Sequence, residues 1–285
     1  MSDRLRLTVL GCGSSPGTPR ITGDWGNCDP TNPKNRRMRT AALVERIAAN
    51  GARTTVVIDT GPDFREQMLL ASVRRIDAVV YTHPHADHIH GIDDLRGFVL
   101  EQRHRIDIHA DQVTMLRLRE AFRYCFETPK GSSYPPIVNA HIIDHNRPVV
   151  IEGEGGALTI EPLPQIHGDI ISLGFRIGNL AYCPDISDFP GATAERMRGL
   201  DMLVIDALQY TFHPSHLSLG QALGWIERLA PKNAVLTHMH VPLDYATVMA
   251  ETPANVEPAY DGMTIEIPYK CTHPVKTADV RIRRP

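Results

Sequence analysis

The stretch Thr82-His83-Pro84-His85-Ala86-Asp87-His88 places three imidazoles and a carboxylate within a few residues of one another. It continues the apolar, β-rich run Ala78-Val79-Val80-Tyr81, which is typical of a short buried strand. The histidines therefore fall in a loop at the end of a strand, where a rigid scaffold positions functional side chains. Imidazole is the commonest metal ligand in proteins, and a carboxylate supplies the negative charge that a dication needs. The stretch predicts a metal site.

The remaining candidate ligands follow other predicted strands in the same way. His167 comes after the alternating stretch 158–163, Asp185 comes after the apolar stretch 180–183, and Thr237-His238-Met239-His240 closes the run 234–237. One polar residue after a strand is usually only a polar terminus. The repetition of this pattern beside residues 83–88 favours convergence of the side chains along one edge of the sheets.

At this point the chain resembles the metallo-β-lactamase superfamily, whose motif is His-x-His-x-Asp-His followed by a later His, an Asp and a final His. The segments 10–17 and 34–40 are similar to the branch that holds the cyclic phosphodiesterase of phosphonate breakdown and, more distantly, tRNase Z. Ile58-Asp59-Thr60-Gly61 matches the first motif of the superfamily. The resemblance spans nearly the whole chain and implies an α/β fold of the αββα type, in which two mixed β-sheets pack together and helices cover the outer faces.

The resemblance also implies two divalent metal ions. His83, His85 and His167 would hold one ion. Asp87, His88 and His238 would hold the other, and Asp185 would bridge both. Zinc is the first expectation because imidazole-rich sites suit it, with manganese and iron as alternatives because carboxylates share the site.

Three further residues are expected to support this site. Asp59 would orient a ligand imidazole through its second nitrogen. Relatives use the Thr-His pair that closes the last strand, so His238 is expected as the ligand, and His240 is expected to lie behind the ligands or to face the substrate. His90 is expected to line the cavity without binding metal. Asp87 is expected to act in catalysis as well as in metal binding.

Length and composition agree with one α/β domain over residues 1–285. The hydrophobic content of 42% is ample for a buried core, and no linker, low-complexity tract or repeat divides the chain. Residues 111–127 are expected to form an amphipathic helix with Val113, Leu116, Phe122, Cys125 and Phe126 near one face. Ser218 has capping-box spacing ahead of a second helix that ends before Pro231. Residues 11–33, which include Trp25, are expected to form a long functional loop.

Charge and cysteine content restrict the partners and the compartment. A formal net charge of −3 argues against a protein that holds a long polyanion, so a small phosphoester or nucleotide is expected and a stable nucleic-acid partner is not. Arg36 and Arg37, in a small basic cluster, are weak candidates for contacts with substrate phosphate. There is no apolar membrane span or secretory signal core, and the five cysteines have no close pair, so a cytoplasmic protein is expected, with a homodimer left open. Cys28 has no neighbouring cysteine with which to form an additional zinc site.

The leading prediction for function is a phosphodiesterase. Two dications lower the pKa of a shared water and stabilise charge on both sides of a displacement, so attack by a metal-bridging hydroxide is expected. Phosphodiesterases of this branch carry a histidine just before the late helix, and His216 matches it. It is therefore expected to be catalytic, by protonating the leaving alkoxide. His109 and His141 stand apart from any ligand spacing and are expected to be ordinary surface or core residues.

Three alternatives remain open at the sequence level. An RNA 3′-end nuclease like tRNase Z would need a basic extension for gripping RNA, which the chain lacks. A thioester or lactone hydrolase would not require His216. A non-catalytic ligand-binding or carrier protein of the same fold would be expected to lack some of the metal ligands, all of which are present here.

Overall fold

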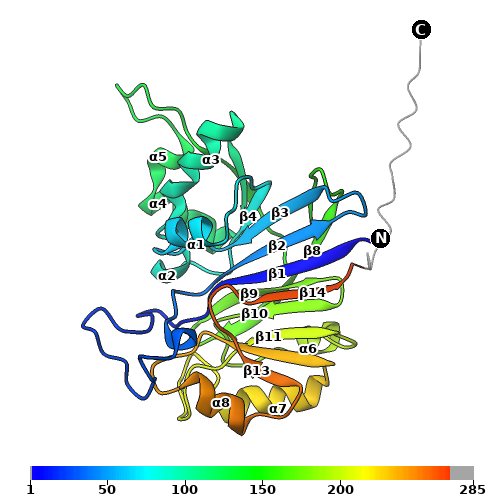
Figure 1. The fold of residues 1–285 in the computed structure, drawn as a ribbon. Helices are drawn as coiled ribbons and strands as arrows, with labels where there is room; N and C mark the ends of the chain where they lie inside the picture. The colour runs from blue at the N-terminus through cyan, green and yellow to red at the C-terminus, as the bar shows by residue number, and fades with distance from the viewer. Residues whose placement is uncertain (1, 270–285) are drawn as a thin grey trace.

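The computed structural model describes residues 2–269, which form two seven-stranded sheets packed face to face (Figure 1). In spatial order, the first sheet contains β14 (Thr264–Pro268), β1 (Arg4–Gly11), β2 (Ala41–Ile47), β3 (Arg53–Ile58), β4 (Ala78–Val80), β5 (Ile106–Ala110) and β6 (Val138–Ile142). The second contains β13 (Val256–Pro258), β12 (Asn233–Thr237), β11 (Met202–Asp206), β10 (Leu180–Cys183), β9 (Ile170–Ile177), β8 (Leu158–His167) and β7 (Val149–Ile151). The last part of the expected domain, residues 270–285 with Cys271, lies outside the described residues.

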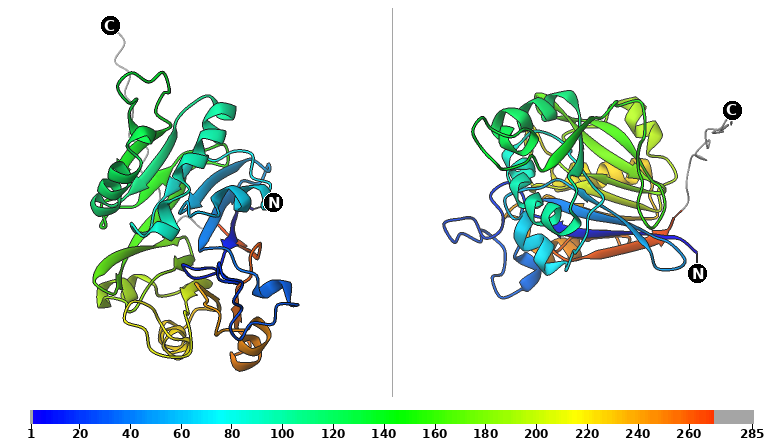
Figure 2. Two further views of the ribbon diagram at one scale, coloured as in Figure 1. Left: turned by 90° about the vertical axis from the view of Figure 1, so that its left-hand side faces the viewer. Right: turned by 90° about the horizontal axis from the view of Figure 1, so that it is seen from above.

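Helices cover the outer faces of both sheets (Figure 2). The first sheet carries α1 (Phe64–Leu70), α2 (Ala86–Ile89), α3 (Leu95–Gln102), α4 (Gln112–Ala121) and α5 (Arg123–Phe126). The second carries α6 (Gly191–Arg196), α7 (Leu219–Leu229) and α8 (Tyr245–Glu251). Two short 3₁₀ segments, η1 (Pro33–Asn35) and η2 (Ile92–Asp94), complete the elements. The predicted αββα sandwich is confirmed. No helix within residues 2–269 has the length and apolar content needed to cross a membrane.

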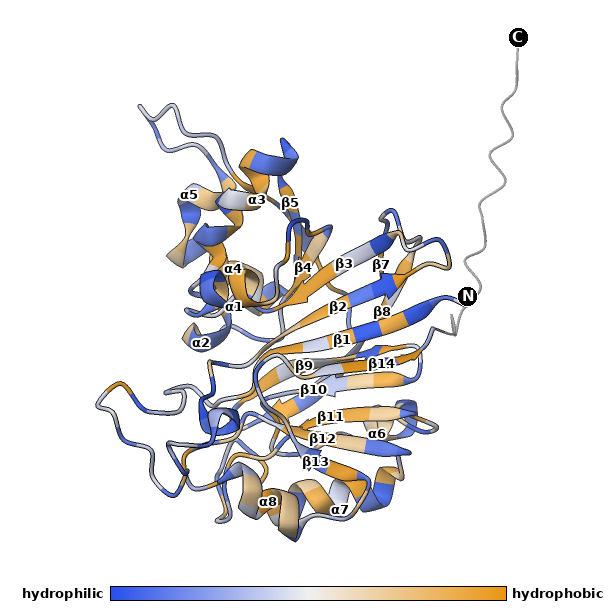
Figure 3. Cartoon of the chain, viewed as in Figure 1, coloured by the Kyte–Doolittle hydropathy of each residue, from blue (hydrophilic) through white to orange (hydrophobic). Residues whose placement is uncertain are grey.

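The strands show why the two layers form. In β1, Leu5, Leu7 and Val9 point into the core between the sheets, while Arg6 and Thr8 alternate with them on the outer face, a pattern of period two visible in Figure 3. β11 lies between parallel neighbours and is covered on both faces, so its residues 203–205 are all buried. The chain thus builds one core that fills the space between the sheets and continues beneath α6 to α8, and a second core beneath α1 to α5.

One predicted helix is confirmed and the other needs correction. Ser218 caps α7 in a complete capping box, as its spacing predicts. The expected single helix over residues 111–127 is instead broken at Phe122, whose φ of −129° is not helical, into α4 and α5. The expected apolar face is wrong in its first part, because Val113 and Leu116 are mostly exposed and Leu118 is buried instead. Its second part is confirmed, since Cys125 is buried and Phe122 and Phe126 pack against the same core. The apolar spacing in this segment fits more than one face, and tertiary packing selects among them.

Strand order brings the candidate ligands to one edge. β10, β11 and β12 run parallel, as do β3 and β4, so the loops that follow these strands leave the sandwich on the same side. Gly61, in the loop after β3, allows the segment of α2 to approach closely: a Cβ at this position would lie 2.1 Å from the backbone oxygen of Asp87. The fold therefore builds a compact site where the loops of the two sheets meet.

Candidate metal centre

The first sheet contributes the histidine-rich stretch. His83 is the third residue after the strand β4, and the chain then turns into α2, with His85 as its N-cap residue. Asp87 and His88 lie on this single helical turn and are buried, and His83 is buried as well, whereas His85 is exposed at the rim. The short helix gathers four polar side chains into one small volume.

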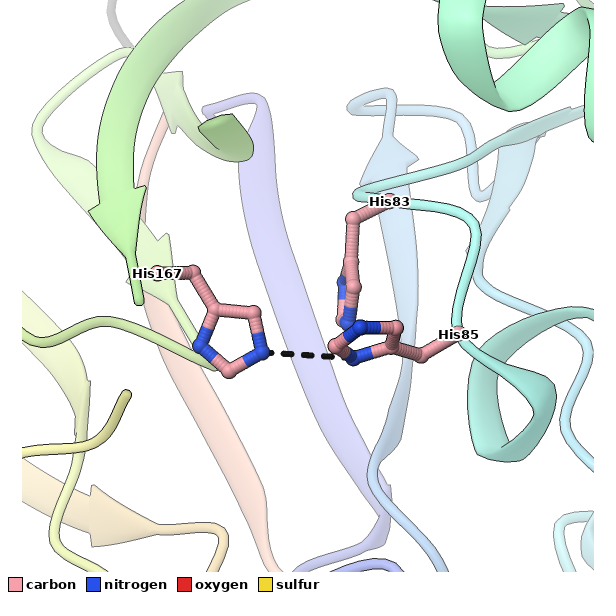
Figure 4. A group of neighbouring side chains, drawn as sticks. All are labelled: His83, His85 and His167. Carbon is pink, nitrogen blue, oxygen red and sulfur yellow. Dashed lines mark hydrogen bonds between the residues drawn. The ribbon is translucent and has the colours of Figure 1, made fainter. Parts of the chain in front are cut away.

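The second sheet contributes three buried side chains from three different strands. His167 is the last residue of β8, Asp185 is the second residue after β10, and His238 directly follows β12. Each is no more than 2% exposed. Figure 4 shows His167 reaching across to His83 and His85 from the opposite side, with its Nε2 3.3 Å from the Nδ1 of His85.

Asp185 occupies the middle of the cluster. Its Oδ1 lies 3.8 Å from the Nε2 of His83 and 3.9 Å from the Nε2 of His167. Its Oδ2 lies 3.2 Å from the Nε2 of His88 and 3.0 Å from the Nδ1 of His238. One carboxylate thus faces imidazoles from both halves of the cluster, which is the position expected of a bridging ligand.

The hydrogen bonding of the cluster tests whether metal ions fit. Buried polar atoms in native proteins almost always have a partner, because an unmade hydrogen bond in the interior costs free energy. Among the described residues, five buried atoms of this cluster have none: His83 Nε2, Asp87 Oδ2, His88 Nε2, Asp185 Oδ2 and His238 Nε2. Aligned imidazole and carboxylate lone pairs without donors are what divalent cations require, so the residues fit the implied ions.

The ligand atoms also fall into overlapping sets of suitable size. Within each set, one atom per residue lies within 4.8 Å of the others. The four sets are His83–His85–His167, His83–His88–Asp185, His167–Asp185–His216 and Asp87–Asp185–His238. The structure therefore brings together all seven predicted ligands, and the assignment of each to a particular ion stays a prediction.

The charge state of the cluster suits a cation. Burial lowers the pKa of His83 well below its usual value and that of His167 to about 4, so both rings are neutral and offer a lone pair at neutral pH. Burial also acts against a proton on His88, but the carboxylates of Asp185, Asp87 and Asp59 outweigh it and raise the pKa of His88. The centre concentrates negative charge that bound dications would neutralise.

Buried partners fix the orientation of the ligand rings. His88 Nδ1–H donates to Asp59 Oδ2 at 2.6 Å, and Asp59 is itself held by the backbone N–H and the hydroxyl of Thr82. His167 Nδ1–H donates to the backbone oxygen of Ser215 at 2.6 Å. In both rings the second nitrogen is left to face the cluster. Asp59 thus lies where a residue that orients a ligand is expected.

Backbone strain also marks the centre. Among residues 2–269, six residues other than glycine have positive φ, and three of them follow helix ends, where such φ values are common: Ser72, Arg103 and Ala230. The other three are Asp59, Asp185 and His238, with φ of 66°, 50° and 57°. A left-handed conformation at such residues costs about 1–3 kcal/mol and persists where the surroundings enforce it. The backbone is thus strained at three junctions between a strand and a loop, and this conformation directs the three side chains toward the cluster.

His216 lies against this cluster. Its hydrogen-bond partner was not predicted from the sequence. The His216 ring stacks on His238 at 4.6 Å and meets His167 edge-on at 4.7 Å. Its Nδ1–H donates to the buried Asp206 Oδ2 at 2.6 Å. Asp206 ends the apolar strand β11, so it carries the same signal, a polar residue closing a buried strand, that identified Asp185 and His238.

The remaining predicted residues lie outside the cluster. His240 belongs to none of the metal-binding sets within residues 2–269, and it contacts Ser14 and Arg20 instead. His90 is exposed and packs its ring edge-on against Phe122. His90 likewise belongs to none of the metal-binding sets of the described residues.

The two arginines proposed for phosphate contacts differ in position. Arg36 is exposed. Arg37 is 2% exposed and donates to the backbone oxygen of Leu243 at 2.6 Å and to Asn35 Oδ1 at 3.2 Å. A substrate would reach the guanidinium of Arg37 only by displacing this packing, so its role as a phosphate contact has no support in the geometry.

Comparison with known proteins identifies relatives of the chain. The family model described as the beta-lactamase superfamily domain matches residues 54–239. Among solved structures, a diphosphatase from the PhnP family is 36% identical with a TM-score of 0.82, and the match covers 93% of this chain and 97% of that one. Zn²⁺-bound PqqB from Methylobacterium extorquens is 15% identical, with a TM-score of 0.67 and coverage of 91% and 99%. At that identity the likeness shows the fold alone.

A curated relative is an octanoyltransferase of Porphyromonas gingivalis, which is 31% identical over 264 residues. The match covers 91% of this chain and 51% of that protein. The chain therefore spans about half the length of the curated relative that it matches.

Proposed function

This chain is a hydrolase of the beta-lactamase superfamily, and we propose that it is a dinuclear metal-dependent phosphodiesterase that acts on a small phosphoester, such as a nucleotide or a cyclic ribose phosphate. The observation that carries the proposal is the Asp206–His216 pair beside seven convergent ligands. A proton donor at this position serves a poor leaving group such as an alkoxide, which a thioester or an activated lactam does not present.

The metal complement follows from the ligand set. We propose two divalent ions per chain, with zinc first and manganese or iron as alternatives, since the carboxylates of Asp87 and Asp185 also suit the latter metals. Bound there, the ions supply an activated water near neutral pH and stabilise charge on the attacking and leaving oxygens. Elemental analysis of active protein expressed in defined metal should give two ions per chain. One ion or none in an active preparation would contradict the dinuclear proposal.

The side chains supply positioning and proton transfer. Asp206 accepts the Nδ1–H of His216 and so turns Nε2 toward the leaving oxygen, to which the protonated ring donates its Nε2–H. Burial lowers the pKa of His216, which makes its protonated ring a stronger acid. Asp87 Oδ2, buried without a partner among the described residues, is proposed to orient the attacking water. Each role places a defined atom next to the bond that forms or breaks.

The relatives favour phosphoryl chemistry without fixing the substrate. The relative at 36% identity is named as a diphosphatase, and it aligns over nearly the whole of both chains. The octanoyltransferase name would favour acyl chemistry, but this chain spans only about half of that protein. We therefore propose a small phosphoester as the partner molecule, and neither a stable nucleic-acid partner nor a membrane, and we keep acyl compounds as competing substrates in the test.

The test is a substrate panel on metal-loaded protein. Bis(p-nitrophenyl) phosphate and a 2′,3′-cyclic nucleotide represent phosphodiesters, and p-nitrophenyl phosphate represents monoesters. A lactone, a thioester, nitrocefin and a precursor tRNA represent the alternatives. We expect the diesters to be hydrolysed fastest, and an Asp185→Ala preparation purified in the same way reports contaminating activity. A preference for the thioester, nitrocefin or the tRNA would overturn the substrate class and leave the metal centre intact.

A further inference from the structure

A cavity of about 720 Å³ lies on the outer face of the first sheet. Neither the seven predicted metal ligands nor His216 lines it. Its floor is formed by β1, β2 and β3, and its wall is formed by the end of α1 and the segment that follows this helix. Figure 1 shows α1 beside one end of these strands, and the rest of their outer face is open in that view. The volume lies in the range of small-molecule sites, and the cavity is separate from the metal centre.

One end of the cavity is formed by charged side chains of the strands. Arg6, Glu45 and Thr55 are register partners across β1, β2 and β3 and line the cavity as one row. Glu45 is buried and lies 2.7 Å from Arg53 and 3.6 Å from Arg6, which also pairs with Glu266. The buried carboxylate is therefore matched by two arginines and leaves no free negative charge that would repel an anion.

Two further arginines, Arg74 and Arg75, line the cavity from the segment after α1. Arg75 is anchored by Asp77, whose carboxylate accepts from Arg75 Nε at 3.3 Å and from the backbone N–H of Thr55 at 2.8 Å. Glu154 lies 3.9 Å from Arg75 and is exposed. Arg74 is exposed as well and forms no ion pair within residues 2–269. Its uncompensated charge favours an anion, and the guanidinium donors match the oxygens of a phosphate.

The opposite end of the cavity lies beside α1 and is largely apolar. Leu10 and Leu43 contribute to its floor, and Leu70 and Val73 contribute to its wall. Leu10 is four residues from Arg6 in β1, so the floor extends about 13 Å between these two side chains. A cavity of this length and polarity suits a molecule with an apolar ring at one end and an anion at the other.

Two buried polar side chains line the apolar end. Gln67 is 1% exposed, and its Nε2 donates to Arg39 O at 2.8 Å, whereas its Oε1 has no partner among the described residues. A buried acceptor without a partner costs free energy, so a ligand with an N–H donor suits this wall. Asp261 accepts from the backbone N–H groups of Cys12 and Met38 at 3.0 and 2.7 Å. Burial raises the pKa of Asp261 to about 7, so near neutral pH it carries less than a full negative charge.

We propose that this cavity is a second, non-catalytic site for a nucleoside monophosphate, with the phosphate on Arg74 and Arg75 and the base beside α1. Leu10 and Leu43 pack against the base, and an N–H group of the base donates to Gln67 Oε1. The site goes beyond the proposed function and does not depend on which substrate the metal centre takes.

The segment 38–40 connects the cavity to the metal centre. Met38 and Arg39 are held by Asp261 and Gln67, which line the cavity. The hydroxyl of the next residue, Thr40, lies 3.1 Å from the Nδ1 of His238, a predicted metal ligand. A nucleotide that engages Gln67 therefore acts on the support of this ligand, and we expect the bound nucleotide to change kcat at the metal centre.

Calorimetry with adenosine 5′-monophosphate tests the site. Asp185→Ala disables the metal centre and leaves the cavity unchanged, so this variant should still bind one nucleotide per chain. Arg74→Glu should weaken this binding about 10- to 100-fold, as expected for loss of a charged hydrogen-bonding partner, when it is introduced into the same Asp185→Ala protein. Adenosine and ribose 5-phosphate, which each lack one half of the ligand, should bind more weakly than the nucleotide by a similar factor.

Arg198→Glu is the matched control, because Arg198 is an exposed arginine paired with Glu195 after α6. It should bind the nucleotide as the unchanged protein does. In the protein with an intact centre, Arg74→Glu should leave kcat/KM for a diester unchanged and remove the response of kcat to adenosine 5′-monophosphate.

The absence of nucleotide binding in Asp185→Ala, or equal binding with and without Arg74→Glu, would overturn the site. A nucleotide that binds at Arg74 without altering kcat would overturn the connection to the metal centre. If the protein hydrolyses no diester, the proposed function fails, whereas the calorimetric comparison still decides whether the cavity binds the nucleotide.

Discussion

Within residues 2–269, two groups of neighbouring histidines differ in what surrounds their nitrogen atoms. At the metal centre, His83 and His88 are fully buried. On strands β5 and β6, His109 and His141 stack at 4.7 Å, but the side chain of His141 is 47% exposed. Proximity of imidazoles is therefore common to both groups and does not by itself identify a metal site.

The two groups differ in whether their polar atoms have hydrogen-bond partners. His141 Nε2 lies 3.3 Å from Asp107 Oδ1, and Asp107 also accepts from Asn139, so the exposed ring of His141 has a partner. The centre instead keeps buried nitrogens and carboxylate oxygens that have no partner among residues 2–269. Such atoms are costly unless a cation binds them. The contrast shows that buried, unpaired lone pairs, and not histidine density, point to the ions.

The largest expected effect tests the centre directly. Asp185→Ala removes the carboxylate that faces imidazoles from both halves of the cluster, so metal content should fall well below two ions per chain, and activity toward both an activated and an unactivated diester should fall to background. Elemental analysis and rate measurements on the same preparation check this. A variant that keeps two ions would mean that Asp185 is not the bridge, and the contrast with the exposed pair would lose its main support.

His216→Ala separates chemistry from metal binding. The ring lies against the ligands and is expected to donate a proton, so the variant should keep two ions and its fold. The rate with a ribose leaving group should fall about 10²- to 10⁴-fold, whereas a p-nitrophenolate leaving group needs little help. Asp206→Asn, which keeps the size of the partner and replaces its carboxyl group by an amide, should reduce the same rate by a smaller factor. Small, equal effects of His216→Ala on both diesters would make this histidine structural.

The sequence predicted much of this centre for a physical reason. A polar residue that closes a buried parallel strand must emerge at the shared edge of the sheet, so strand endings located His83, Asp185 and His238 before any geometry was known. Asp206 obeys the same rule, and it was missed because no ligand motif drew attention to it. The pairing of Asp206 with His216 depends on the path of the loop after β11, which local patterns do not encode.

The parts of the molecule that the sequence did not predict depend on tertiary contacts. The face that α4 buries is selected by packing against the first sheet, and its apolar spacing fits more than one face. The contact between Arg20 and His240 joins residues 220 positions apart in the chain, and nothing in either segment specifies it. Short-range sequence patterns therefore predict the strands and where they end. Which side chains contact one another depends on the tertiary fold.

Asp59→Asn probes the support behind a ligand ring. Asp59 accepts the Nδ1–H of His88, and replacing its charge by an amide should weaken ion binding by about 10- to 100-fold without abolishing the fold. Competition with a chelator measures this affinity. Asp107→Asn is the matched change in the exposed pair and should leave the affinity unchanged. Equal affinities in the two variants would contradict an orienting role for Asp59.

The smallest effect is expected from breaking the exposed ion pair between His141 and Asp107. His141→Ala removes a ring whose ion pair with Asp107 is open to solvent on both sides, with side chains 47% and 48% exposed. Exposed pairs of this kind contribute about 0–1 kcal/mol, so the unfolding temperature should shift by no more than about 2–4 °C. The variant should keep two ions per chain and an unchanged kcat/KM toward a diester, since neither Asp107 nor His109 belongs to the metal-binding sets of the described residues. Loss of one ion in His141→Ala would show that the exposed pair binds metal, and burial of unpaired lone pairs would then fail as the feature that distinguishes the two groups of histidines.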